Sequence, residues 1–98
     1  MPDKTMRLEY HLRDDVDVSA YLPHLAAFAG ALRAEPACRS YQPFQAEADP
    51  RHFLHLGVFS GELAFTSAPW FTAFTARLRG LTVAPPSVLW LAPAVRDS

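Results

Sequence analysis

The chain has 98 residues and a mass of 10.9 kDa, which is the size of a single domain. Half of the residues are hydrophobic and 19% are charged, so the composition excludes an intrinsically disordered chain. Nine basic and ten acidic residues, without blocks of one sign, give a net charge of −1 and argue against binding to nucleic acid or to an anionic membrane. We therefore expect one domain over residues 1–98.

The N-terminal third of the chain predicts a strand followed by a helix. Apolar and polar side chains alternate over residues 6–13, which is typical of a half-buried strand. The polar residues 14–17 indicate a surface turn. Ser19 is a suitable N-cap for a helix that has Pro23 in its first turn, where a proline removes no intrahelical bond. The Glu-Pro pair at residues 35–36 ends this helix, because the residue before a proline disfavours helical torsion angles.

The rest of the chain predicts two strands, a second helix and a final strand. Residues 37–48 are expected at a sheet edge or with a bulge, because Pro43 cannot donate a hydrogen bond to a neighbouring strand. Residues 52–60 are apolar on both faces, as in a strand that is covered on both sides. A helix follows over residues 67–80, with the serine and the glycine at its ends as cap and stop. Residues 87–92 form the last strand.

This order predicts an α+β fold, the ferredoxin-like βαββαβ subunit with a four-stranded antiparallel sheet. Both helices would cover one face of the sheet. The other face of residues 52–60 is apolar too, and Trp90, between Leu89 and Leu91, is expected to add to the uncovered area. We therefore expect a homodimer in which the two sheets pack face to face around a twofold axis.

Four segments of the chain resemble the antibiotic biosynthesis monooxygenase (ABM) superfamily in order and spacing. They are the first strand, the Glu-Pro-Ala-Cys segment at residues 35–38, the apolar strand at 52–60, and the Ser-Ala-Pro-Trp-Phe segment at 67–71 with Phe74. The resemblance covers nearly the whole chain. It implies a dimeric α/β barrel made of two ferredoxin-like subunits.

Members of this family that oxygenate use neither a metal nor a flavin, because their substrate forms a carbanion and reduces dioxygen itself. The resemblance therefore implies a cofactor-independent monooxygenase that acts on a small aromatic or quinol-like compound in a dry pocket. We predict that His55 takes or shares the substrate proton, and that Tyr41 and Trp70 orient the oxygen that becomes anionic. The residues expected to line the pocket are Tyr21, Phe28, Phe71 and Phe74. Aromatic side chains at helical spacing also fit an ordinary packed core.

Other kinds of site find little support in the sequence. His52 and His55 are three residues apart on a strand, so they point to opposite faces and cannot bind one ion together. With a single cysteine, Cys38, we expect no disulfide and no cysteine-rich zinc site. The sequence has no His-x-x-x-His or Glu-x-x-His spacing, so we expect no metal site, and the resemblance implies that no cofactor is used. Haem-degrading relatives use an asparagine, which this chain lacks. No apolar segment resembles a signal peptide or a membrane span, so we expect a cytoplasmic protein.

A non-catalytic protein of the same fold, binding an apolar ligand or another protein, is the alternative. It explains why three features common in the family are replaced here. Alanine replaces a glycine at Ala37, Gly-Glu replaces an aromatic–acidic pair at residues 61–62, and Phe-Thr replaces a histidine at residues 65–66. An open pocket that reaches a histidine would favour the enzyme, and a closed core would favour the binding protein.

Overall fold

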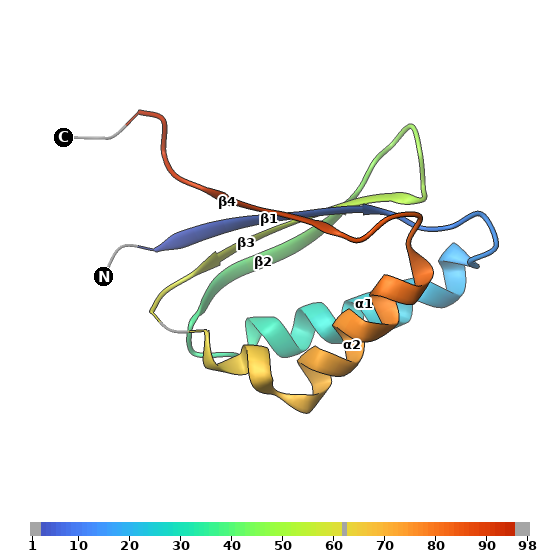
Figure 1. Ribbon diagram of the computed structural model, residues 1–98. Helices are drawn as coiled ribbons and strands as arrows, with labels where there is room; N and C mark the ends of the chain where they lie inside the picture. Colours follow the sequence, from blue (N-terminus) through green and yellow to red (C-terminus); the bar gives the residue numbers. More distant parts are fainter. Residues whose placement is uncertain (1–2, 62, 96–98) are drawn as a thin grey trace.

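The computed structural model describes residues 3–61 and 63–95 and has the predicted order of elements (Figure 1). The strands are β1 (Lys4–His11), β2 (Cys38–Gln45), β3 (His52–Phe59) and β4 (Ser87–Leu91). The helices are α1 (Val18–Arg33), α2 (Pro69–Leu81) and the short 3-10 helix η1 (Ala64–Ser67). The fold is α+β with the ferredoxin-like βαββαβ order. Within the described residues, no helix is long and apolar enough to cross a membrane.

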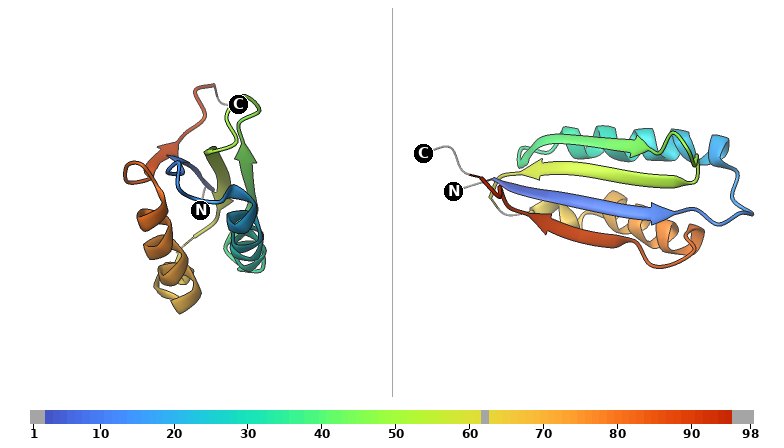
Figure 2. Two further views of the ribbon diagram at one scale, coloured as in Figure 1. Left: turned by 90° about the vertical axis from the view of Figure 1, so that its right-hand side faces the viewer. Right: turned by 90° about the horizontal axis from the view of Figure 1, so that it is seen from above.

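The four strands form one antiparallel sheet in the order β2-β3-β1-β4. Both helices lie on the same face of this sheet, which leaves the opposite face without a layer of its own (Figure 1 and Figure 2). β2 is an edge strand and contains Pro43, as predicted. Its register shift lies earlier, between Cys38 and Ser40. We call the helix-covered side the inner face and the opposite side the outer face.

The core is formed by the side chains on one face of the strands and on one side of α1. Tyr10 of β1 and Phe53, His55 and Phe59 of β3 are buried on the inner face, whereas His11 is exposed. α1 adds buried residues at the spacing expected for one side of a helix: Tyr21, Leu25, Phe28, Ala29 and Leu32. The core thus lies between the sheet and the helices.

The start of α1 differs from the prediction. Asp17 caps the helix, because its Oδ1 accepts hydrogen bonds from the backbone N–H groups of Ser19 (3.0 Å) and Ala20 (3.4 Å). The helix therefore begins at Val18, and the assignment of Ser19 as N-cap is wrong. Pro23 consequently lies in the second turn instead of the first. A carboxylate is as suitable as a hydroxyl for this role and also interacts favourably with the helix dipole.

Both ends of α2 also differ from the prediction. The hydroxyl of Ser67 donates to the carbonyl of Ala64 at 3.1 Å and caps nothing in α2. The helix begins at Pro69, where a missing N–H removes no helical bond. It continues through Gly80 to Leu81, so the glycine is not its stop.

The register of β4 assigns its side chains to the two faces. Trp90 pairs with Met6 and therefore lies on the inner face. The expectation that Trp90 adds to the uncovered sheet area is therefore wrong. Its neighbours Leu89 and Leu91 do lie on the outer face, where they are 50% and 40% exposed. Because β4 is apolar on both faces, only its pairing with β1 decides which side chains point outward.

Candidate functional site

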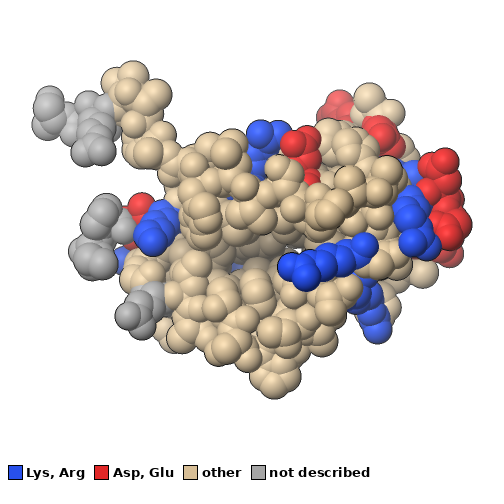
Figure 3. All heavy atoms as spheres, in the orientation of Figure 1, with Lys and Arg blue, Asp and Glu red and all other residues tan. Residues whose placement is uncertain are grey.

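An apolar pocket of about 190 Å³ lies between the inner face of the sheet and α2. In the view of Figure 3 the surface is hollowed between the sheet and α2, and most of the residues around the hollow are uncharged. The aromatic residues that line the pocket are Phe28, Tyr41, Phe59, Phe65, Phe71, Phe74 and Trp90. An apolar cavity of roughly 150 Å³ can bind benzene, so this pocket has the volume for a one-ring aromatic molecule.

Few polar groups face this pocket. The threonine hydroxyls in its lining donate to backbone carbonyls three residues earlier, that of Thr66 to Leu63 at 2.8 Å and that of Thr75 to Thr72 at 3.1 Å. The other lining residues with a polar side-chain group are Tyr41 and Trp90. The surface of the pocket is almost entirely apolar, so a bound molecule would be held mainly by apolar contacts.

Tyr41 is the first member of a buried hydrogen-bonded chain that contains the predicted histidine. Its hydroxyl lies 2.5 Å from Nδ1 of His55, and Nε2 of His55 lies 2.8 Å from the hydroxyl of Tyr10. The Tyr10 hydroxyl in turn lies 2.5 Å from that of Tyr21. We call these four residues, contributed by β2, β3, β1 and α1, the Tyr–His network. Both ring nitrogens of His55 have a tyrosine partner, and the side chain is completely buried.

Strand register explains why these side chains meet. The Cα partners of His55 are Leu8 on β1 and Pro43 on β2. Tyr10 and Tyr41 are two residues from these partners and thus lie diagonally across from His55 on the same face. Diagonal neighbours in a sheet are about 7–8 Å apart, which long aromatic side chains can bridge.

Gly57 provides the space in which the ring of Tyr41 lies. Gly57 is the Cα partner of Tyr41, and a Cβ at this position would be 2.8 Å from Cδ1 of Tyr41 and 2.7 Å from Cε2 of Phe59. These distances are shorter than van der Waals contacts, so only glycine fits without movement of both rings.

Burial keeps the Tyr–His network uncharged at neutral pH. Desolvation lowers the pKa of His55 to about 4 and raises the pKa of Tyr21 to about 12. It also raises the pKa values of Tyr10 and Tyr41. A neutral imidazole has one N–H donor and one acceptor nitrogen. His55 can therefore pass a hydrogen between its two tyrosine partners, but holding a net positive charge there is costly.

The structure brings together some of the predicted site residues. His55, Tyr41 and Tyr21 belong to the Tyr–His network, and Phe28, Phe71 and Phe74 line the pocket. Trp70 lies elsewhere, in a groove between α1 and α2, where its ring packs edge-on against Phe28 at 5.9 Å.

Sequence reasoning missed Tyr10 and Trp90. The alternation of β1 indicates that Tyr10 is on the same face as Leu8. Its contact with His55, however, could be predicted only from the register between β1 and β3. Among residues 3–61 and 63–95, no three His, Cys, Asp or Glu side chains are grouped so that they could hold a metal ion.

No protein-family model and no curated protein matches the sequence significantly. Solved structures, in contrast, match over nearly its full length. Rv0793 from Mycobacterium tuberculosis aligns with a TM-score of 0.82 and 23% identity, covering 99% of this chain and 100% of that one. A protein described as an antibiotic biosynthesis monooxygenase aligns with a TM-score of 0.83 and 17% identity, covering 94% and 99%. The chain has the ABM fold.

SnoaB from Streptomyces nogalater, described as a cofactor-independent oxygenase, shares this fold at a TM-score of 0.80 and 12% identity, with 98% of this chain and 97% of that one covered. The resemblance that the sequence suggested is thus confirmed at the level of the ABM fold. The chemistry of this chain has to be argued from its own residues.

Proposed function

We propose that the chain is a cofactor-independent monooxygenase that oxidises a small aromatic compound of the hydroquinone type. The observation that carries this proposal is the apolar pocket lined by Tyr41, whose hydroxyl is hydrogen-bonded to the buried His55. The ABM fold supports it, because SnoaB has the same fold and is described as a cofactor-independent oxygenase.

The reaction requires an electron-rich anion and dioxygen. Loss of a proton turns a hydroquinone into an anion that transfers electrons to O₂. One oxygen atom then replaces a ring hydrogen and the other leaves as water, so that hydroquinone and O₂ give hydroxyquinone and H₂O. The substrate supplies all four electrons, and O₂ is the only oxidant.

The pocket residues favour this reaction in two ways. The aromatic walls exclude water, which would otherwise stabilise the substrate anion and reduce its reactivity. We propose that, with substrate bound, the hydroxyl of Tyr41 and the indole N–H of Trp90 turn toward the oxygen that becomes anionic and donate hydrogen bonds to it. His55 shares the proton through Tyr41 and holds that hydroxyl in place. Trp70 supports the wall by packing against Phe28.

Two measurements test the proposal. The first compares substrates of different size, and the second removes the hydroxyl of Tyr41. We would measure oxygen consumption with one-ring hydroquinones and three-ring anthrones, and we expect the one-ring compounds to react faster. Tyr41→Phe should lower kcat by about 100-fold, as removal of one hydrogen-bond donor to an oxyanion does in other enzymes. Thr72→Val removes an exposed hydroxyl of α2 and serves as the control. Rates no higher than the uncatalysed oxidation for every compound would contradict the proposal.

We also propose that two copies form a homodimer through their outer faces. The exposed apolar side chains on this face support the proposal, since Leu56 and Leu89 are 37% and 50% exposed in the single chain. Sedimentation equilibrium at micromolar concentration should give twice the chain mass. Leu56→Glu should produce monomers, whereas Leu22→Glu, on α1 and similarly exposed at 40%, should not. A wild-type species near 10.9 kDa would contradict the dimer.

A second candidate is a non-catalytic protein that binds an apolar ligand in the same pocket. It is favoured by the apolar lining and by the tyrosine partners that occupy both nitrogens of His55. Tight binding of benzene without oxygen consumption on any hydroquinone would support this candidate over the enzyme.

A further inference from the structure

The apolar pocket is closed on one side and open on the other. Tyr41 of β2 and Phe59 of β3, which line it, are only 3% and 2% exposed. Met6 of β1 also lines it and is partly buried, whereas Trp90 of β4 is 50% exposed. The exposure of the lining thus rises across the sheet in the strand order β2-β3-β1-β4. The open side of the pocket is therefore at β4.

The helices divide the pocket in the same way. α1 lies beneath β2, and α2 lies on the side of β4 (Figure 2, left). From α1, Phe28 and Leu32 line the pocket, and both are buried. From β4, the second lining residue is Val88, which is 52% exposed. We call the open side of the pocket, bordered by Val88 and Trp90 and visible as the hollow between the sheet and α2 in Figure 3, the mouth.

The position of β4 in the sheet explains why the mouth is open. Val88 and Trp90 pair with Leu8 and Met6 of β1 and therefore face the pocket. Within the described residues, no strand pairs with the other edge of β4. Val88 and Trp90 thus have the pocket on one side and solvent on the other.

The volume of the pocket limits what it can enclose. A cavity of roughly 150 Å³ holds benzene, so a single ring leaves about 40 Å³ of the 190 Å³ unfilled. This remainder is close to the roughly 30 Å³ that one water molecule occupies. A substituent of several carbons therefore has no room beside the ring. On the closed side it would have to displace the buried rings of Tyr41 or Phe59, whereas at the mouth it displaces no buried side chain.

We propose that the substrate is a hydroquinone with one substituent chain, whose ring fills the closed part of the pocket and whose chain passes Val88 and Trp90 to reach solvent. This inference rests on the proposed function. The two β4 side chains contact the first, apolar carbons of the chain, and its far end stays hydrated and can be polar. The pocket thereby accepts a chain on one side of the ring and rejects one on the opposite side.

Two probes with opposite terminal charges test where the chain leaves the pocket. 4-Phenylbutanoate and 4-phenylbutylammonium each carry a short alkyl chain on a phenyl ring, and their dissociation constants can be measured by NMR titration at 0.15 M salt. Val88→Lys should strengthen binding of the anion about threefold and weaken binding of the cation by a similar factor. Val88→Glu should do the reverse. A steric effect of losing the valine would change the affinity for both probes in the same direction.

Val83→Lys and Val83→Glu are the matched controls. Val83 is also an exposed valine, but it does not line the pocket, and its N–H bonds to the carbonyl of His11. His11 is three residues from Leu8, the partner of Val88, so the two valines are about 10 Å apart along β1. Because 0.15 M salt screens charges over about 8 Å, the Val83 variants should change the affinities much less. Equal effects at both valines, changes of one direction in both Val88 variants, or no binding of either probe to the wild type would overturn the inference.

Turnover tests the chain on the proposed substrate itself. 2-Butylhydroquinone should be oxidised, whereas 2,5-dibutylhydroquinone, with a second chain on the opposite side of the ring, should have a kcat/KM lower by about tenfold or more. Both compounds retain a ring hydrogen that oxygen can replace. Equal kcat/KM values would overturn the inference and leave the proposed function in place. If no hydroquinone is oxidised, the proposed function is overturned, and the charged probes still decide whether a chain leaves through the mouth.

Discussion

Mild acid should weaken the fold through His55. In the unfolded chain this side chain has its ordinary pKa near 6.5, whereas burial lowers its pKa to about 4 in the folded protein. Between these values the unfolded chain binds more protons than the folded one. The stability that the neutral imidazole contributes is therefore fully present above pH 6.5 and is lost as the pH falls toward 4. The difference between the two pKa values corresponds to about 3 kcal/mol.

Urea unfolding followed by tryptophan fluorescence, at fixed protein concentration, measures this loss. Between pH 7 and pH 5 the free energy of unfolding of the wild type should fall by about 2 kcal/mol. His52 lowers the pKa of the Glu9 carboxyl group, and Arg13 lowers that of Asp15, so both groups stay ionised over this range and become protonated only at lower pH. His55→Gln cannot titrate, so its stability should be nearly constant over this range. The same fall in His55→Gln as in the wild type would refute the reasoning.

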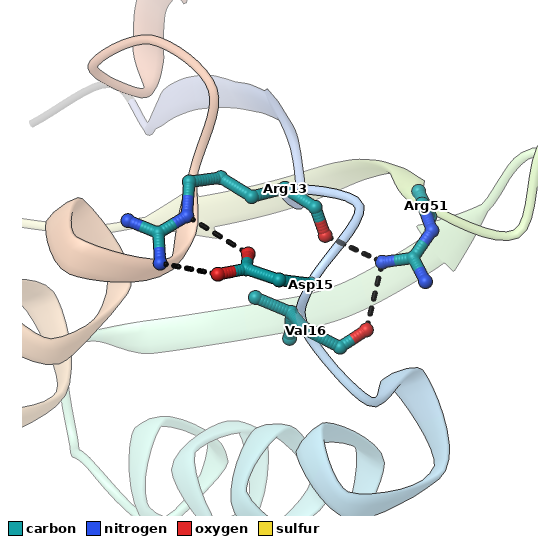
Figure 4. Close-up of polar contacts among 4 residues, drawn as sticks. All are labelled: Arg13, Asp15, Val16 and Arg51. Atoms are coloured by element: carbon teal, nitrogen blue, oxygen red, sulfur yellow. Dashed lines mark hydrogen bonds and ion pairs between the residues drawn. The ribbon is translucent and has the colours of Figure 1, made fainter.

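Three substitutions test other contacts by urea unfolding at pH 7. Gly57→Ala forces the ring of Tyr41 from its position and should cost about 1–3 kcal/mol; an unchanged midpoint would show that the ring can move freely. Asp17→Ala removes the cap of α1 and should cost about 1 kcal/mol, whereas Ser19→Ala should cost much less. Arg51→Met keeps the side-chain stem but removes its hydrogen bonds to the carbonyls of Val16 and Arg13 (Figure 4), of which the latter still accepts from the N–H of Val16, and it should cost about 1–3 kcal/mol. If Arg51→Met unfolds like the wild type, the turn before α1 is held by other contacts.

The element order and the inner face of β1 could be predicted because they depend on local patterns. Alternation over β1 determines which of its residues meet the helices, whereas β3 is apolar on both faces and its inner side follows from its pairing with β1. Pro43 indicated an edge strand because a missing N–H has the same consequence in any sheet. Helix ends were predicted less well. Asp17 and Ser19 are both good caps two residues apart, and only the path of the turn decides between them.

The candidate site depends on register, which a single sequence does not specify. Tyr10 contacts His55 only because β1 and β3 pair with Leu8 opposite His55. The sequence predicted Trp70 as a pocket residue and Trp90 as part of the uncovered sheet area. The pairing of Trp90 with Met6 places it on the pocket side, and the position of Trp70 at the start of α2 places it in the groove between the helices.

The two sides of the pocket differ in how firmly they are anchored. α1 contributes five buried residues to the core, whereas within the described part of the chain α2 contributes Leu78 alone and every residue of β4 is exposed. Local opening of a weakly buried segment costs less free energy than global unfolding. Amide hydrogens of α2 and β4 should therefore exchange with solvent before those of α1 and β3. Transient separation of α2 from β4 would give small molecules an entrance to the pocket while the Tyr–His network, held by α1 and the central strands, stays intact.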